Sequence, residues 1–175
     1  MHDRVGAGNE LGEDDYVGGE VENFDRLAQA LAVLDVPVEA YLRGEVGPVP
    51  EFLRMRGITV HDRPPALADV LARASHVISQ GGAMTSAAVF AAGRPHLVVP
   101  SHDEALINLA LLQQHGVARA MRVSPEIGDI TTAIGDFLAD AALPDAALAA
   151  AQRIAGRPLP DGADVAAGAI RSLLG

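Results

Sequence analysis

Apolar residues occur along this chain in two alternating patterns, and the alternation predicts strands separated by helices. Short apolar runs predict strands over residues 16–17, 36–42, 58–61, 76–79, 96–99 and 118–123. Apolar residues that recur every three or four positions predict helices over 22–34, 51–56, 65–74, the alanine-rich run that ends at Gly93, 103–115, 125–140, 144–155 and 162–174. This order is typical of a Rossmann-like three-layer α/β/α fold with a parallel sheet of about six strands.

The first residues do not share this pattern. Residues 1–14 are polar and glycine-rich, so we expect a flexible lead-in there. The chain has 175 residues and 49% of them are hydrophobic, which is enough for one folded domain with a sizeable core. No internal repeat or linker divides the remainder, and residues 15–175 are therefore predicted to form a single domain.

One turn in this pattern carries candidate chemistry. The predicted strand 76–79 is followed by Gln80, Gly81 and Gly82, and then by a helix. Glycine lets the backbone approach a ligand closely, and the helix start presents unpaired N–H groups at the positive end of its dipole. A phosphate group is the usual ligand of such a turn. The alternative is a turn that is glycine-rich for packing alone.

Charge and composition exclude several classes of function. The formal net charge is −10 and the basic residues do not cluster, which argues against nucleic-acid and anionic-membrane partners. The absence of cysteine removes disulfides, thiol nucleophiles and thiolate metal sites. Neither a membrane-spanning run nor a secretory signal is apparent in the sequence, so we expect a cytoplasmic protein.

Residues 66–120 resemble the nucleotide-sugar-binding half of GT-B glycosyltransferases, above all the macrolide-type and plant-type UDP-glycosyltransferases. The resemblance is carried by the segments Asp69–Ser75, Val77–Gly82 with Thr85, Gly93–Pro95, Val98–Pro100, and Glu104 with Asn108. The turn is also similar to the donor turn of the peptidoglycan-precursor N-acetylglucosaminyltransferases. The resemblance implies a single carboxyl-terminal GT-B-type domain that binds a nucleotide diphosphate sugar, UDP- or TDP-linked, as substrate, with neither a cofactor nor a metal.

The resemblance also assigns roles to particular residues. It implies that Gly81, Gly82 and Thr85 hold the diphosphate, and that Glu104 hydrogen-bonds hydroxyl groups of the donor sugar. Gln80 and Asn108 fall within the same donor-binding pattern. In the family the turn at Gly18 and Gly19 closes over the donor. All of these positions are donor-binding, and the resemblance places no catalytic residue on this chain.

Several residues depart from the family pattern. Gln80 replaces a histidine that contacts the donor phosphates, and an amide supplies no positive charge. Ala88 replaces the glutamate that holds the ribose, Ala105 replaces the glutamine beside the acid, and Glu20 replaces a hydroxyl residue. The chain also lacks tryptophan, which stacks on uracil in plant relatives. Two interpretations fit: a divergent site for another nucleotide, or a site that has lost its donor.

The family's other half is missing from this chain. The resemblance implies that an amino-terminal domain or subunit supplies the acceptor site and the catalytic base, and that the chain alone is inactive. The predicted activity is hexose transfer to a small-molecule or lipid acceptor hydroxyl. The alternatives are a non-catalytic GT-B-like module for protein association, including a homo-oligomer, and half of a nucleotide-sugar epimerase.

Structural explanations compete at three candidate residues. The spacing from Ser101 to Glu104 is that of a capping box, in which Glu104 would bond the start of its own helix. Asn108 sits one turn into that helix, where bracing a loop competes with contacting a ligand. His102 is the histidine best placed for ligand contact, and no histidine pair has the spacing of a zinc site. The turn also lacks the Gly-Lys-Ser/Thr of a P-loop.

Overall fold

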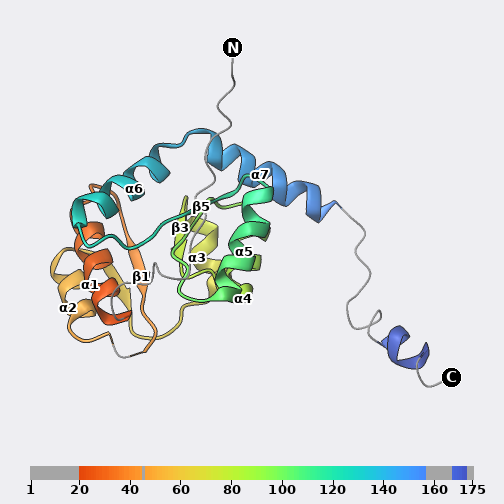
Figure 1. Ribbon diagram of the computed structural model, residues 1–175, viewed down its shortest axis with the longest axis horizontal. Helices are drawn as coiled ribbons and strands as arrows, with labels where there is room; N and C mark the ends of the chain where they lie inside the picture. Colours follow the sequence, from red (N-terminus) through yellow and green to blue (C-terminus); the bar gives the residue numbers. More distant parts are fainter. Residues whose placement is uncertain (1–19, 45, 157–166, 173–175) are drawn as a thin grey trace, which may run out of the picture. The chain divides into compact units, whose positions relative to one another are not determined.

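The computed structural model describes residues 20–44, 46–156 and 167–172 (Figure 1). The chain divides into two compact units, one made of residues 1–65 with 122–135 and the other of residues 66–121 with 136–175. Helix α6 (Ile127–Ala139) begins in the first unit and ends in the second. In the described parts of the chain, no helix is both long enough and apolar enough to cross a membrane.

The described residues of the first unit include a two-stranded parallel sheet and two helices that pack around a small core. Strand β1 (Glu39–Tyr41) pairs with β2 (Thr59–His61), and Ala40 lies opposite Val60. Helix α1 (Glu20–Leu31) contacts α2 (Val49–Met55), which in turn contacts β2. These elements bury Ala28, Val46, Val49, Leu53 and Ile58.

The second unit contains a three-stranded parallel sheet. Strand β4 (His96–Val98) lies between β3 (Val77–Ser79) and β5 (Ala118–Ala120), and all three of its residues are buried. The register places Ser79 opposite Val98 in one pair of strands and Val98 opposite Ala120 in the other. The ends of β3 and β4 are therefore adjacent, and the turns that follow them emerge at the same edge of the sheet.

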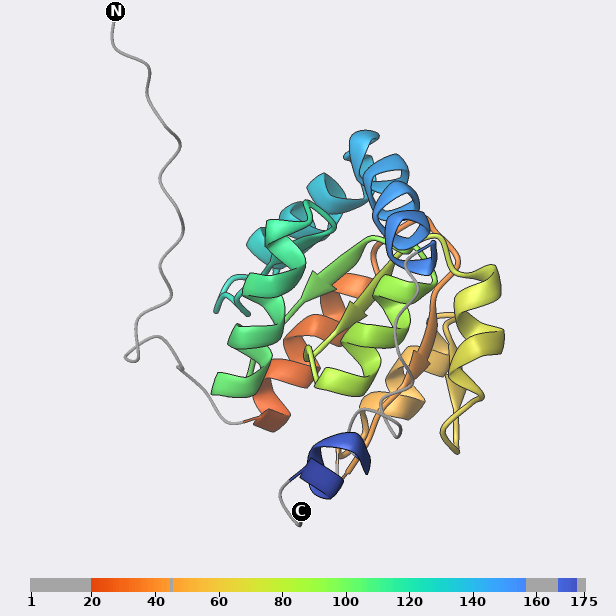
Figure 2. The same cartoon turned by 90° about the vertical axis from the view of Figure 1, so that its right-hand side faces the viewer.

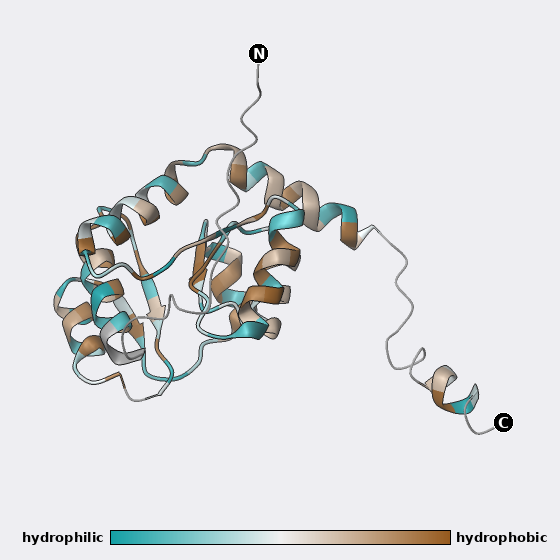
Figure 3. Ribbon diagram, viewed as in Figure 1, coloured by the Kyte–Doolittle hydropathy of each residue, from teal (hydrophilic) through white to brown (hydrophobic). Residues whose placement is uncertain are grey.

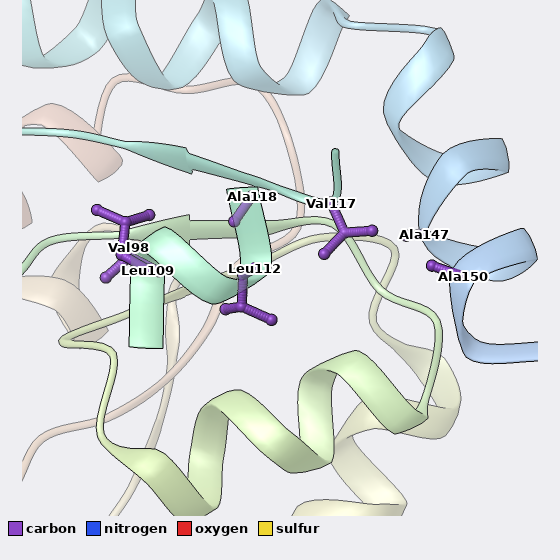
Figure 4. Packing of buried hydrophobic residues seen from close by; sticks show 7 residues of the cluster. All are labelled: Val98, Leu109, Leu112, Val117, Ala118, Ala147 and Ala150. Carbon is purple, nitrogen blue, oxygen red and sulfur yellow. The ribbon is translucent and has the colours of Figure 1, made fainter. Parts of the chain in front are cut away.

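Helices α4 (Ala83–Ala91) and α5 (Asp103–Gln114) lie on one face of this sheet (Figure 2). Helices α3 (Leu67–Arg73) and α7 (Ala142–Ala155) both pack against α4. In Figure 3 the strands β3 and β4 and parts of α4 and α5 carry the brown of apolar residues. The core joins the sheet to α5 and α7 through Val98, Leu109, Leu112, Val117, Ala118, Ala147 and Ala150 (Figure 4).

The predicted α/β class with parallel strands is confirmed, but the sheet differs from the prediction in size. The pattern predicts one sheet of about six strands, whereas the described residues form sheets of two and three strands. The strand expected at 16–17 lies outside the described residues, as do Gly18 and Gly19. Each observed strand has only three residues, because assignment requires paired ladders and a prediction from apolar runs includes the unpaired ends. Of the helix expected over 162–174, residues 167–172 are described and helical.

Candidate functional site

The glycine turn between β3 and α4 has a conformation that requires its first glycine. Gly81 has a φ angle of +81°, which side-chain-bearing residues rarely adopt. A Cβ atom at Gly81 would lie 2.6 Å from Cγ1 of Val98 and 3.3 Å from Cβ of Ala105. Gly81 is therefore needed both for the shape of the turn and for its close packing on β4 and α5.

Gly82 stands in a different environment. It is the N-cap residue of α4, and its φ of −59° and ψ of 145° are open to any residue. Among the residues that the structure describes, no atom lies within 4 Å of the position that a Cβ would take. The backbone at the start of α4 is therefore approachable at Gly82. Gln80, just before the two glycines, is exposed.

Hydrogen bonds from two other elements hold the turn. The amide N–H of Gly81 donates to Oγ of Ser79 at 3.1 Å, and Nδ2 of Asn108 donates to the carbonyl of Gly81 at 2.9 Å. Asn108 thus braces the loop, as one of its two sequence-based interpretations held. The carbonyl that it holds belongs to the residue with the positive φ angle.

A buried histidine, His96, lies beside Ser79 and was not among the site residues predicted from the sequence. Nε2 of His96 is 2.8 Å from Oγ of Ser79, and Nδ1 of His96 has no partner among the described residues. His96 is only 1% exposed, and its burial lowers its pKa from 6.5 to about 4. The ring is therefore neutral near pH 7. A histidine inside an otherwise apolar strand, next to a strand that ends in serine, was the available signal.

Glu104 does not form the predicted capping box. Helix α5 begins at Asp103, and its N-cap is His102, whose Nδ1 accepts a hydrogen bond from the amide of Ala105 at 3.2 Å. The expectation of a Ser101 cap was wrong because the imidazole takes that role one residue later. Oε1 of Glu104 instead accepts a hydrogen bond from the amide of Ala83, the first residue of α4, at 3.2 Å.

The structure thus brings together most of the predicted donor-binding residues. Asn108 bonds the carbonyl of Gly81, and Glu104 bonds the amide of Ala83, the residue after Gly82. Thr85 is the half-buried third residue of α4. Gly18 and Gly19 lie outside the described residues. The turn, the helix start and the carboxylate all lie in the second unit.

Residues 55–155 match the family model described as the glycosyltransferase family 28 C-terminal domain. The chain belongs to this family. The resemblance to the carboxyl-terminal domain of GT-B glycosyltransferases is therefore confirmed. No curated protein matched the chain in sequence.

Solved glycosyltransferase structures resemble this family 28 domain in fold. The spinosyn forosaminyltransferase SpnP has a TM-score of 0.65 at 23% identity, with 79% of this chain and 35% of SpnP covered. SnogD from Streptomyces nogalater has a TM-score of 0.59 at 26% identity, covering 86% and 39%. VinC, in complex with DTDP, has a TM-score of 0.60 at 21% identity, covering 76% and 33%. The chain thus spans about a third of the length of these proteins.

Two alanines of the family 28 domain, Ala105 and Ala88, stand where the family pattern has polar side chains. Ala105, in place of the glutamine beside the acid, is fully buried with its Cβ toward Gly81. Ala88, at the position to which the resemblance assigns the family's ribose-binding glutamate, lines an open groove of about 490 Å³ between α3 and α4. Arg94, at the edge of this groove, donates hydrogen bonds to the carbonyls of Leu71 and Ala72 at 2.9 and 3.3 Å.

The described residues of the family 28 domain contain no group of three histidine, aspartate or glutamate side chains placed to hold a metal ion. The polar groups near the start of α4 are backbone amides, the side chains of Gln80, Thr85 and Asn108, and the carboxylate of Glu104. Chemically, this arrangement offers hydrogen-bond donors to an anion and one strong acceptor to hydroxyl groups.

Proposed function

We propose that this chain is the donor-binding carboxyl-terminal domain of a glycosyltransferase that moves a hexose from a nucleotide diphosphate sugar to a hydroxyl of a small-molecule or lipid acceptor. Residues 15–175 constitute that domain. An amino-terminal domain or subunit provides the acceptor site and the base, and the chain alone does not turn over. Membership of the glycosyltransferase family 28 supports the reaction class.

One observation carries the proposal: the approachable backbone at Gly82, directly at the start of α4. The first amides of a helix have no acceptor within that helix, and the helix dipole favours an anion beside them. Gly81 shapes the turn that leads to this point, and Asn108 fixes it. The donor diphosphate binds at these amides, with the Thr85 hydroxyl in the first turn of the helix.

In the reaction, the acceptor oxygen attacks the anomeric carbon of the donor sugar. The bond from that carbon to the β-phosphate oxygen breaks, and the nucleoside diphosphate leaves with the electron pair. The acceptor's proton passes to a base on the amino-terminal half. This chain orients the donor and stabilises the negative charge on the leaving diphosphate through the helix amides, without a metal.

The nucleotide is a uridine or thymidine diphosphate. VinC, which was solved in complex with DTDP, has the fold of this chain and supports this choice. Glu104 accepts hydrogen bonds from sugar hydroxyls, which charged acceptors bind strongly. Gln80 donates to the phosphates through its exposed amide, in the place of the family's histidine.

Calorimetric titration of the full chain with UDP, TDP and their hexose conjugates tests this function. We expect binding of at least one nucleotide sugar with a Kd in the micromolar to millimolar range. An absence of heat with every nucleotide and sugar conjugate at millimolar concentration would overturn the proposal. Chelator in the buffer should leave the affinity unchanged, since no metal takes part.

A second candidate function, a non-catalytic module for protein association, is favoured by one contact. The carboxylate of Glu104 occupies the amide of Ala83, which a phosphate would otherwise use. This module would form a dimer or hetero-complex through the same surface. Sedimentation of a monomer that also binds a nucleotide sugar would exclude it.

A further inference from the structure

The backbone amide of Ala83, the first residue of α4, donates a hydrogen bond to the carboxylate of Glu104. Oε1 of Glu104 lies 3.2 Å from the backbone nitrogen of Ala83, although the two residues are 21 positions apart in the sequence. A carboxylate in this position has the charge and the acceptor oxygens of a phosphate, and the helix dipole favours it for the same reason. Glu104 thus takes the place at this amide that an anionic ligand would take.

The carboxylate of Glu104 can move away from the Ala83 amide at little cost. Both Ala83 and Glu104 are exposed, so breaking the hydrogen bond buries no unpaired group. The backbone around Glu104 is fixed, however, because His102 caps α5 and Asn108 ties that helix to Gly81. Rotation of one side chain therefore uncovers the Ala83 amide and leaves the turn and both helices in place.

We infer that Glu104 gates the Ala83 amide, competes there with diphosphate, and thereby favours a nucleotide sugar over a free nucleoside diphosphate. The inference rests on the proposed donor site. A free diphosphate displaces the carboxylate and leaves it beside like charges, with only water to donate hydrogen bonds to it. A diphosphate that carries a hexose brings hydroxyl groups, and these donate to the displaced carboxylate. Glu104 therefore also promotes release of the nucleoside diphosphate after transfer.

The test compares the full chain with Glu104→Gln and with Asp103→Asn. Each variant removes one negative charge from the first turn of α5, but only Glu104 bonds the amide of Ala83. Inorganic pyrophosphate, UDP, TDP and their hexose conjugates are titrated by calorimetry. We expect Glu104→Gln to bind pyrophosphate about fivefold or more tightly than the parent chain, and Asp103→Asn to differ by less than about twofold. We also expect Glu104→Gln to lose the preference for nucleotide sugar over nucleotide.

Backbone amide spectra give a second readout that needs no donor. The Ala83 amide resonance should move in Glu104→Gln and stay in place in Asp103→Asn. Equal pyrophosphate affinity in the parent chain and Glu104→Gln, binding to neither, or an unmoved Ala83 resonance would overturn the gate. Failure of every nucleotide sugar to bind the parent chain, with pyrophosphate still bound more tightly by Glu104→Gln, would overturn the proposed function and retain the competition at Ala83. A melting curve for each variant checks that the fold is intact.

Discussion

The side chain of Asn108 donates a hydrogen bond to the carbonyl of Gly81 at 2.9 Å, although the two residues are 27 positions apart in the sequence. The bond ties the second turn of α5 to the turn that begins α4. It holds the carbonyl of the residue whose φ angle is positive. The conformation of the candidate donor turn is thus set by a helix that follows the next strand.

Replacing Asn108 with alanine should loosen this turn. The carbonyl of the buried residue Gly81 loses its donor, so we expect the free energy of unfolding to fall by about 1–2 kcal/mol. Chemical denaturation measures the change. Gln113→Ala, at an exposed position on the same helix, is the control and should alter stability by less than about 0.5 kcal/mol. A similar loss in both variants would argue against the bracing role.

Gly81→Ala should destabilise the domain more than a strained backbone alone would. The added Cβ meets Cγ1 of Val98 at 2.6 Å, and the positive φ angle adds its own cost. We expect a loss of about 3 kcal/mol in the free energy of unfolding. Gly116→Ala is the matched control, because Gly116 has a φ of +70° with no atom of the described residues within 4 Å of a Cβ. It should lose about 1 kcal/mol. Equal losses would show that packing against Val98 does not matter.

Gly82→Ala should separate ligand binding from stability. The φ and ψ angles of Gly82 suit alanine, so the free energy of unfolding should change by less than about 1 kcal/mol. The methyl group would stand where we propose that the donor diphosphate binds, and nucleotide-sugar affinity should fall about tenfold or more in calorimetry. Gly135→Ala in α6, also free of nearby atoms among the described residues, should leave affinity unchanged. Retained affinity in Gly82→Ala would count against the proposed diphosphate position.

His96 should make the domain less stable in mild acid. Burial lowers its pKa from 6.5 to about 4, so between these values the unfolded chain binds a proton that the folded chain does not. The free energy of unfolding therefore carries no penalty from His96 above pH 6.5, and it decreases as the pH falls from 6.5 toward 4. The lowered pKa corresponds to about 3 kcal/mol.

Denaturation of the parent chain and His96→Gln at pH 7, 5.5 and 4 measures this effect. The stability of His96→Gln should fall less over this range than that of the parent chain. His76→Gln is the comparison, because burial lowers the pKa of His76 as well. Unlike His96, the ring of His76 is only half-buried, and it contacts Phe137. An equal decline in the parent chain and His96→Gln would rule out His96 as the main source.

Local sequence determined the order of elements and the position of the candidate site. The alternation of apolar runs and helical spacing placed all five described strands and the helices from α1 to α7, because short-range periodicity follows backbone geometry. The pair Gly81-Gly82 located the turn for the same reason, since glycine's freedom is a property of the residue itself. The family resemblance also came from spacing along the chain and was confirmed by the family model.

Only the tertiary structure decided what the polar side chains of the site contact. Ser101 and Glu104 satisfy the local pattern of a capping box, yet His102 caps α5 and Glu104 crosses to Ala83. Likewise, the pairing of His96 with Ser79 depends on two strands lying side by side. A side chain's partner is set by which elements pack together and by the desolvation of its polar atoms, and neither follows from spacing within one segment.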